Sequence, residues 1–134
     1  MREAVSLLEF AGLRITQPRL QIARILFADG EHRHVSAEQV YGQLQMTGKR
    51  IALATVYNTL GRFVDAGLLH PISARGLDAT LFDTNMAPHH HFLNETTGEL
   101  TDIPEGEVPL DLLPKPGDDS EILSCELVIR TQAK

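Results

Sequence analysis

Three consecutive histidines, His89 to His91, have the residue type and spacing in this chain that are best suited to chemistry. On a strand, His89 and His91 would share one face and His90 would point to the other, because side chains alternate. Two imidazoles two residues apart on one face can reach the same metal ion. The spacing therefore indicates a metal site, although surface histidines beside a turn that bind metal only adventitiously would give the same pattern.

Further ligands for such a site lie elsewhere in the sequence. His34 precedes an expected helix, Asp83 ends an expected strand, and Asp102 lies near the end of another. Imidazole nitrogens mixed with carboxylate oxygens suit Zn, Mn or Fe(II), and ligand type alone does not choose among them. These three residues join His89 and His91 as candidate ligands, with the identity of the metal left open.

A second pattern suited to function lies between Ala52 and Gly67, where we expect a helix that Gly67 ends. Its apolar residues recur at helical spacing and form one stripe, made of Val56, Leu60, Phe63 and Val64. The opposite face carries polar residues with a tyrosine at its border, namely Thr55, Asn58, Arg62 and Tyr57. A helix with a polar outer face that leads into a β-hairpin is what a winged helix-turn-helix places in a DNA groove. An ordinary amphipathic helix packed on a hairpin would show the same periodicity.

Helices in the N-terminal part must position this polar face. The sequence predicts a first helix over residues 3–10 and a second from the N-cap Thr16 to Phe27, with Pro18 in its first turn. A capping box at Ser36–Gln39 opens the third helix. Together with the helix before Gly67, these elements match the helical part of a winged helix-turn-helix.

The remaining chain reads as short strands, expected over residues 69–74, 79–83, 89–93, 99–103 and 121–130. The first two would form a wing hairpin around residues 75–78. Prolines leave at most one or two helical turns near residues 108–113. We therefore expect an α+β fold, with a winged-helix DNA-binding domain over residues 1–84. A small α/β dimerisation and sensing domain with a short antiparallel sheet would follow over residues 85–134.

Composition restricts the class of protein. The chain has 134 residues, of which 43% are apolar and 22% charged, as in a globular protein. No apolar run approaches the roughly 20 residues that a membrane span needs, and the N-terminus does not resemble a signal peptide. The single cysteine, Cys125, excludes an internal disulfide and suits a reducing compartment. We therefore expect a cytoplasmic protein with no membrane partner.

The net charge of −6 is unevenly distributed along the chain. Residues 1–78 carry nine Lys and Arg against seven Asp and Glu, whereas residues 79–134 carry three against eleven. A mildly basic part can neutralise phosphates even when the whole protein is acidic. The acidic part, a three-stranded unit with exposed edges and little core, is expected to complete itself against a second copy.

Five motifs in the same order along the chain give this sequence a resemblance to a known family. They are Gly-Leu-Arg-Ile-Thr-Gln-Pro-Arg (12–19), His-Val-Ser-Ala-Glu (34–38), Leu-Ala-Thr-Val-Tyr-Asn-Thr-Leu (53–60), Asp-Ala-Gly-Leu-Leu (65–69) and the histidine cluster. Together they resemble the ferric uptake regulator family along nearly the whole chain. Phe-Asp-Thr-Asn (82–85), Asp-Ile-Pro (102–104) and the Pro-rich segment are most similar to the iron response regulator branch of that family.

The resemblance implies a repressor that binds a palindromic DNA operator as a homodimer. It puts Tyr57 and Asn58 at groove-reading positions, Arg14 toward the minor groove and Arg19 on a phosphate. Thr55 and Arg62, which helical spacing places on the same polar face, complete the predicted DNA-binding residues. Most of the family has arginine where Asn58 stands. Because Asn pairs with adenine where Arg favours guanine, the operator is expected to differ from the usual family sequence. For Arg19, an ordinary solvated charge on a helix remains the alternative.

The regulatory metal site of the family maps onto the candidate ligands His34, Asp83, His89, His91 and Asp102, and the resemblance implies that it spans both domains. Asp replaces the usual Glu at two of these positions, so either the backbone approaches the metal or the affinity falls. Coordination would fix the angle between the domains and thereby the separation of the two DNA-reading helices. The structural zinc that many relatives hold with two Cys-x-x-Cys pairs is expected to be absent, because Asn94 and Thr97 occupy the positions of the first pair.

The iron response regulator branch links its His-His-His run to haem, and imidazole is a common axial ligand of haem iron. The resemblance therefore makes His89, His90 and His91 a candidate haem site, although a Cys-Pro dipeptide found in some members is missing here. Repression of iron and haem metabolism genes is the implied function. A manganese-, zinc- or peroxide-sensing regulator of the same family is the alternative.

Two other classes of function would use the same side chains. A zinc hydrolase needs an open coordination position beside a general base in a pocket. The sequence shows no nucleophile motif and the expected wing supplies no such pocket, so we expect a protein that is not an enzyme. A metal or haem carrier that has lost DNA binding is disfavoured by the intact helix around Thr55 and Asn58.

Overall fold

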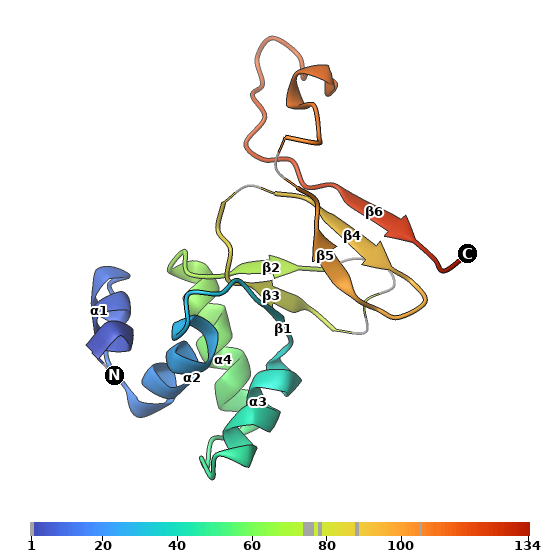
Figure 1. Cartoon of the computed structure of the whole chain (residues 1–134). Helices are drawn as coiled ribbons and strands as arrows, with labels where there is room; N and C mark the ends of the chain where they lie inside the picture. The colour runs from blue at the N-terminus through green and yellow to red at the C-terminus, as the bar shows by residue number, and fades with distance from the viewer. Residues whose placement is uncertain (1, 74–76, 78, 88, 105) are drawn as a thin grey trace. The chain divides into compact units, whose positions relative to one another are not determined.

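Figure 1 shows the computed structural model of the chain, which describes residues 2–73, 77, 79–87, 89–104 and 106–134. Its contacts divide the chain into an N-terminal unit, Met1–Met86, and a C-terminal unit, Ala87–Lys134. The N-terminal unit contains α1 (Arg2–Phe10), α2 (Gln17–Phe27), β1 (His34–Val35), α3 (Ala37–Met46), α4 (Leu53–Asp65), β2 (His70–Ile72) and β3 (Leu81–Asp83). The C-terminal unit contains β4 (His91–Asn94), β5 (Leu100–Asp102), the 3-10 turn η1 (Leu110–Leu112) and β6 (Val128–Thr131).

Capping side chains fix where α2 and α3 begin. The Thr16 hydroxyl accepts a hydrogen bond from the backbone N–H of Arg19 at 3.3 Å. At α3, the Ser36 hydroxyl accepts from the N–H of Gln39 at 3.1 Å, and the Gln39 side chain accepts from the N–H of Ser36 at 2.9 Å. Both predicted caps are therefore confirmed. α4 begins differently, because its N-cap, Ala52, has no side-chain hydrogen bond to offer.

The core of the N-terminal unit lies between α2, α3 and α4, which contact one another pairwise, while α1 packs on α2. Its largest fully buried side chains are Leu8, Ile22, Leu26, Val40, Leu44, Val56, Leu60, Phe63 and Leu69. On α4 the buried residues are Val56, Leu60 and Phe63, as predicted, with Thr59 beside them, whereas Val64 is half-buried. The polar face of α4 is thereby left outside the core.

A three-stranded antiparallel sheet closes the N-terminal unit, in the order β1-β3-β2. The sequence analysis missed β1, which is only two residues long and therefore has no readable alternation. β3 is central, and Asp83 lies directly opposite His34 on one side and His70 on the other. Directly opposite residues of antiparallel strands share a face, so the three side chains start from the same face of the sheet.

The sheet of the C-terminal unit has the order β5-β4-β6 and is mixed. β4 pairs antiparallel with β5 but parallel with β6, so the expected antiparallel sheet is wrong for its last strand. The physical reason is that the connection after β5 carries the chain past β4 to its other edge, where β6 runs opposite to β5 and therefore parallel to β4. In Figure 1 the chain after β5 leaves the sheet and comes back as β6, which lies beside β4.

Several predicted strands are shorter than expected. The closing strand begins at Val128 instead of residue 121, because residues 121–127 are exposed and irregular. β4 begins at His91 and not at residue 89, so His89 and His90 precede the strand. In the expected wing hairpin β2 and β3 pair antiparallel, while Arg75, Gly76 and Asp78 of its turn lie outside the described residues. No helix in the described part of the chain combines the length and apolar character needed to cross a membrane.

Candidate functional site

His34 and Asp83 form a pair of potential metal ligands in the N-terminal unit. The register of β1 and β3 places them opposite each other, and His34 Nε2 lies 3.1 Å from Asp83 Oδ2. Asp83 is fully buried, and its Oδ1 accepts a hydrogen bond from the N–H of Asn85 at 2.8 Å. A buried carboxylate is unfavourable unless it is paired or coordinates a metal, so this position is constrained by chemistry as well as packing.

Backbone contacts hold β1 against the segment after β3. The N–H of Arg33 donates to the Thr84 hydroxyl at 2.9 Å, and the N–H of Thr84 donates to the Arg33 carbonyl at 3.1 Å. These two bonds lie next to the register pair of His34 and Asp83. Two strand residues of β1 are therefore enough to hold the imidazole of His34 beside the carboxylate.

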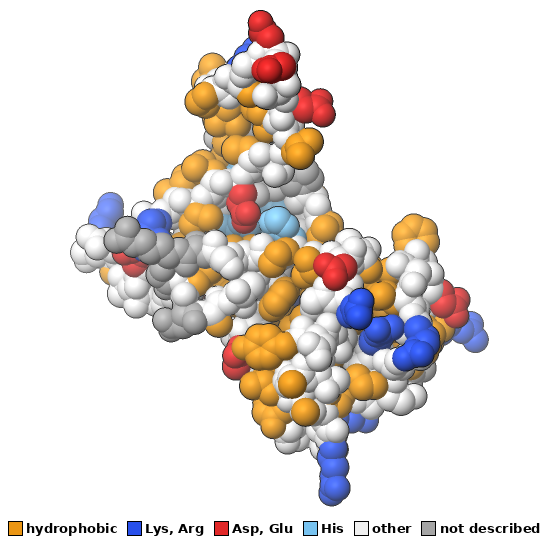
Figure 2. Space-filling view, turned by 180° about the vertical axis from the view of Figure 1, so that it is seen from behind, with side chains coloured by type: hydrophobic (Ala, Val, Ile, Leu, Met, Phe, Trp, Pro, Cys, Tyr) orange, Lys and Arg blue, Asp and Glu red, His pale blue; other side chains and the backbone are white. Residues whose placement is uncertain are grey.

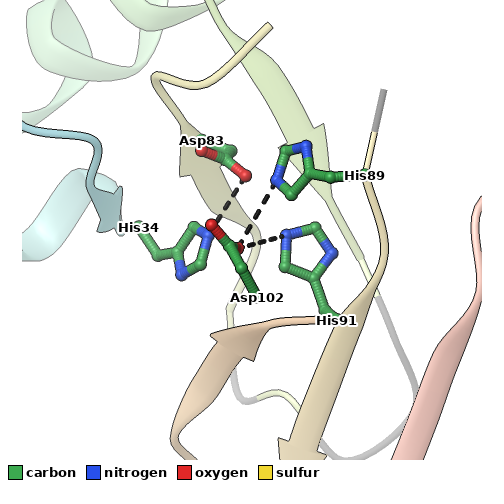
Figure 3. Close-up of side chains that lie close together, drawn as sticks. All are labelled: His34, Asp83, His89, His91 and Asp102. Atoms are coloured by element: carbon green, nitrogen blue, oxygen red, sulfur yellow. Dashed lines mark hydrogen bonds and ion pairs between the residues drawn. The ribbon is translucent and has the colours of Figure 1, made fainter. Parts of the chain in front are cut away.

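His89, His91 and Asp102 form a trio of potential ligands in the C-terminal unit. His91, on β4, lies directly opposite Asp102, on β5, and its Nε2 is 3.3 Å from Asp102 Oδ1. The Nε2 of His89 is 3.5 Å from the same carboxylate oxygen, and the two imidazole rings pack at a centroid distance of 4.5 Å. Figure 3 labels all five side chains, and its dashed lines join the pair in one unit and the trio in the other.

The geometry of the trio suits a divalent metal ion. Two ligand atoms that each lie about 2.1 Å from a metal are separated by roughly 3.0–3.4 Å in octahedral or tetrahedral coordination. The nitrogen–oxygen distances of the trio, 3.3 and 3.5 Å, are close to this range. These three side chains belong to the set in the described residues that could hold a metal ion.

Hydrogen bonding fixes the tautomer of His89 in the form that a metal needs. Its Nδ1 lies 2.6 Å from the carbonyl oxygen of Ala87, and because that oxygen only accepts, Nδ1 carries the proton. In a neutral ring with this tautomer the lone pair is on Nε2, the nitrogen that faces Asp102 and could bind a metal ion. A carbonyl that orients a ligating histidine in this way is the usual outer-shell arrangement of metal sites.

His90 differs from its two neighbours. Its Nδ1 accepts a hydrogen bond from the N–H of Leu127 at 2.9 Å, and its carbonyl accepts from the N–H of Ile103 at 2.8 Å. His90 therefore ties the start of β6 and the end of β5 to the chain before β4. The expectation that His90 points away from His89 and His91 fits these contacts, although His90 precedes the strand itself.

The outer face of α4 presents the side chains that the sequence assigned to DNA. Tyr57 is 46% exposed, Asn58 and Arg62 are exposed, and Thr55 is half-buried. The Tyr57 hydroxyl donates a hydrogen bond to a carboxylate oxygen of Glu38, in the first turn of α3. This bond lowers the pKa of the Glu38 carboxyl, and the carboxylate raises the pKa of the Tyr57 hydroxyl.

Arg14 and Arg19, the other two residues assigned to DNA, are linked through the backbone. The guanidinium of Arg19 donates from Nη1 to the Arg14 carbonyl oxygen at 2.8 Å. The side chain of Arg14 is exposed and that of Arg19 is half-buried. Arg19 thus stabilises the loop before α2, and Arg14 is the more exposed of the two.

Sequence reasoning missed three residues near these sites. Glu38 contacts Tyr57, His70 lies opposite Asp83, and Glu126 Oε1 is 3.9 Å from His91 Nδ1. The register of the wing hairpin could have indicated His70, because a symmetric hairpin pairs its first strand with Asp83. For Glu38 and Glu126 no sequence signal exists, since both contacts join elements far apart in the chain.

A hydrogen-bonded turn occupies the positions where many relatives are expected to bind structural zinc. Asn94 Oδ1 accepts from the N–H groups of Thr96 and Thr97, at 2.9 and 3.2 Å. The Thr97 hydroxyl accepts from the N–H of Glu99 at 3.2 Å, and Cys125 is exposed and not in a disulfide. Asn and Thr side chains here close the hairpin between β4 and β5 as local backbone caps.

Comparison with known proteins gives consistent similarities. The model of the Ferric uptake regulator family matches residues 10–112. A ferric uptake regulation protein of Pseudomonas aeruginosa is 37% identical over 98 residues, which cover 73% of this chain and 72% of that protein. The peroxide-responsive repressor PerR of Staphylococcus aureus is 33% identical over 103 residues, covering 77% and 68%. Among solved structures, the Pseudomonas aeruginosa ferric uptake regulator with manganese has a TM-score of 0.75 and 29% identity, and the match covers 98% of both chains.

Proposed function

The chain belongs to the ferric uptake regulator family, and from this premise we propose that it represses iron and haem metabolism genes by binding palindromic operator DNA as a homodimer. Members of the family are metal-responsive transcription regulators and not enzymes. The observation that carries the proposal is the convergence of the His89 and His91 nitrogens on one oxygen of Asp102. Such a regulator acts where the DNA is, in the cytoplasm.

We propose that one divalent ion is held by His34, Asp83, His89, His91 and Asp102 together. Covalent geometry supports this, because five residues lie between Asp83 and His89, and the six peptide units that join the two span at most about 20 Å. Each set alone offers few ligands, two in the N-terminal unit and three in the C-terminal unit. A bound ion would supply positive charge that favours one relative orientation of the two units, and thus one spacing of the α4 helices in a dimer.

Metal affinity of single variants tests this shared coordination. His91→Ala and His34→Ala should each lower the affinity of the full chain for Mn²⁺ by at least about tenfold. His32→Ala, which removes an exposed histidine, is the matched control and should bind like the wild type. If His34→Ala binds Mn²⁺ as tightly as the wild type, the trio holds the ion alone and the coupling between the units is wrong.

For DNA binding, we propose that α2, α3, α4 and the hairpin β2–β3 act as a winged helix-turn-helix. The proposed contacts are Thr55, Tyr57, Asn58 and Arg62 in the groove, Arg14 toward the minor groove and Arg19 on a phosphate. Support comes from the exposed polar face of α4 and from its first turn, where Ala52 leaves the N–H groups without a side-chain cap. Such N–H groups favour a phosphate oxygen.

A homodimer through the C-terminal unit is supported by its exposed apolar side chains. Leu112 is 77% exposed, Leu123 is 89% exposed, and Ile122, Leu127 and Ile129 are exposed as well. Figure 2 shows apolar side chains beside carboxylates on the segment at the top of the view. Several large apolar side chains exposed in so small a unit favour an interaction site, and a second copy would bury them.

Haem sensing through His89, His90 and His91, as in the iron response regulator branch, would require a change in the hydrogen bonding of His90. An imidazole that binds iron through Nε2 has its proton on Nδ1. Because Nδ1 of His90 accepts from the N–H of Leu127, ligation through His90 Nε2 would break that bond. Haem binding by His90 should therefore increase hydrogen exchange at Leu127, whereas binding by His89 and His91 alone should not.

The competing function is a manganese-, zinc- or peroxide-sensing regulator, which the likeness to a peroxide-responsive repressor favours. Purified protein titrated with haem, with Mn²⁺ and with Fe²⁺, followed by DNA mobility-shift assays, separates the two. Release of DNA by haem supports the iron and haem assignment. If haem leaves DNA affinity unchanged while Mn²⁺ raises it, the iron and haem assignment is wrong and the protein is a manganese-sensing regulator.

A further inference from the structure

Tyr57 is one of the proposed base-reading side chains of α4, and its hydroxyl donates a hydrogen bond to Glu38. Among the described interactions, this is the one that fixes the position of such a side chain. Glu38 and Tyr57 are 19 positions apart in the chain, so the bond joins α3 to α4 across the proposed helix-turn-helix. Both side chains lie on the surface, and Tyr57 is 46% exposed. An exposed hydrogen bond contributes little to the free energy of unfolding. Its main effect is therefore on the orientation of the Tyr57 side chain.

We propose that Glu38 is a positioning residue for sequence recognition, which holds the Tyr57 ring in one orientation on the outer face of α4. The inference rests on the proposed DNA-binding function of that face. A tyrosine free in solution samples several rotamers, and binding then has to immobilise one of them. With its hydroxyl already bound to Glu38, the ring reaches the groove pre-oriented.

The negative charge of Glu38 does not favour DNA binding itself. A carboxylate on a surface that approaches phosphates repels them, so Glu38 lowers the affinity for every DNA sequence alike. A residue that weakens all complexes but orients one base-reading side chain acts on discrimination. The glutamate therefore contributes to the difference between operator and other DNA, not to the strength of binding as such.

Three variants separate orientation from charge. Glu38→Gln removes the charge but keeps an oxygen that can accept from the Tyr57 hydroxyl, whereas Glu38→Ala removes both. Tyr57→Phe removes the hydroxyl and keeps the ring. Glu31→Ala removes a negative charge from another exposed position of the same unit and is the matched control for charge.

The experiment uses the full chain with MnCl2. Wild-type protein first selects a consensus from a random duplex DNA library, and each variant is then measured on that consensus and on its single-base changes at several salt concentrations. We expect Glu38→Ala and Tyr57→Phe to reduce discrimination at the same base pair by about three- to tenfold, the range of one hydrogen bond. Glu38→Gln should keep discrimination within about twofold, while it binds all duplexes more tightly.

A spectroscopic titration checks the contact itself. In a Tyr41→Phe background, Tyr57 is the remaining tyrosine, and its ultraviolet titration reports its own pKa. Because Glu38 raises the pKa of the Tyr57 hydroxyl, Glu38→Ala should lower that pKa in the free protein. An unchanged pKa would overturn the contact.

The outcomes also separate this inference from the function on which it rests. If Glu38→Ala, Glu38→Gln and Glu31→Ala all raise affinity equally and leave discrimination unchanged, Glu38 acts as a charge and the positioning role is wrong. If the wild type selects no consensus at all, the DNA-binding function itself fails. Loss of discrimination in Glu38→Ala together with its retention in Glu38→Gln supports the proposal.

Discussion

The two units of this protein differ in how completely they bury their apolar residues. In the N-terminal unit, helices enclose a core whose central side chains, such as Phe63 and Leu60, have no exposed surface. In the C-terminal unit, Leu93, Leu100 and Ile103 are buried, while Leu112 and Leu123 are largely exposed. A three-stranded sheet has one layer and two free edges, so it cannot enclose a core by itself.

This difference fits different roles for the two units. A unit with a closed core can keep its outer face polar and fixed, which suits recognition of a rigid ligand such as duplex DNA. A unit with an open apolar surface gains stability only when a partner covers that surface, which suits assembly and regulation.

The largest expected effect is on the closed core. Phe63→Ala should destabilise the N-terminal unit by about 3–5 kcal/mol, because it removes a fully buried ring from a packed core. The measurement is urea unfolding followed by circular dichroism. Phe10→Ala, at a position 92% exposed, is the control and should change stability by less than about 0.5 kcal/mol. Equal effects of the two variants would contradict the closed core.

The second prediction concerns the open surface. Leu123→Asp should weaken self-association by at least about tenfold, because it places a charge on apolar surface that a second copy would bury. Met46→Asp is a matched control, since Met46 is 88% exposed on α3 and Leu123 is 89% exposed in the C-terminal unit. Sedimentation equilibrium measures both variants. If the dimer survives Leu123→Asp but dissociates with Met46→Asp, the interface lies in the N-terminal unit and the prediction is wrong.

The third prediction compares a local cap from each unit. Asn94→Ala removes the acceptor of two backbone N–H groups in the hairpin turn, and Thr16→Ala removes the cap of α2. Each should cost about 1 kcal/mol in thermal unfolding. We expect the melting temperature of Asn94→Ala to depend on protein concentration, because association in the proposed dimer would stabilise the C-terminal unit. A concentration-independent transition in both variants would remove the distinction between the units.

The smallest expected effect is the pH dependence of the hydrogen bond between Tyr57 on α4 and Glu38 on α3. The hydrogen bond from Tyr57 lowers the pKa of Glu38, so the folded-state value lies below the unfolded one. Its stabilisation is therefore present above the unfolded pKa and is lost as pH falls through the folded pKa. The small difference in melting temperature between wild type and Glu38→Ala should therefore shrink as pH falls through the folded-state pKa of Glu38 and vanish below it. A difference that persists in acid would have to come from the helical position of residue 38, not from its charge.

Much of the local structure was determined by the sequence alone. Thr16 and the Ser36–Gln39 box predicted the starts of α2 and α3, and the apolar stripe predicted which face of α4 is buried. These features succeed because a cap or a stripe depends on residues within a few positions of each other. Candidate ligands were also recognisable from their types, since His89, His91 and Asp102 do come together in one unit.

Contacts between distant segments needed the tertiary structure. The sequence could not show that β6 runs parallel to β4, that β1 exists to hold His34 beside Asp83, or that Glu38 meets Tyr57. Residue types and periodicity specify which side chains can do chemistry and which face is apolar. Register and chain direction depend on packing between elements that are remote in sequence, and so only the folded chain decides them.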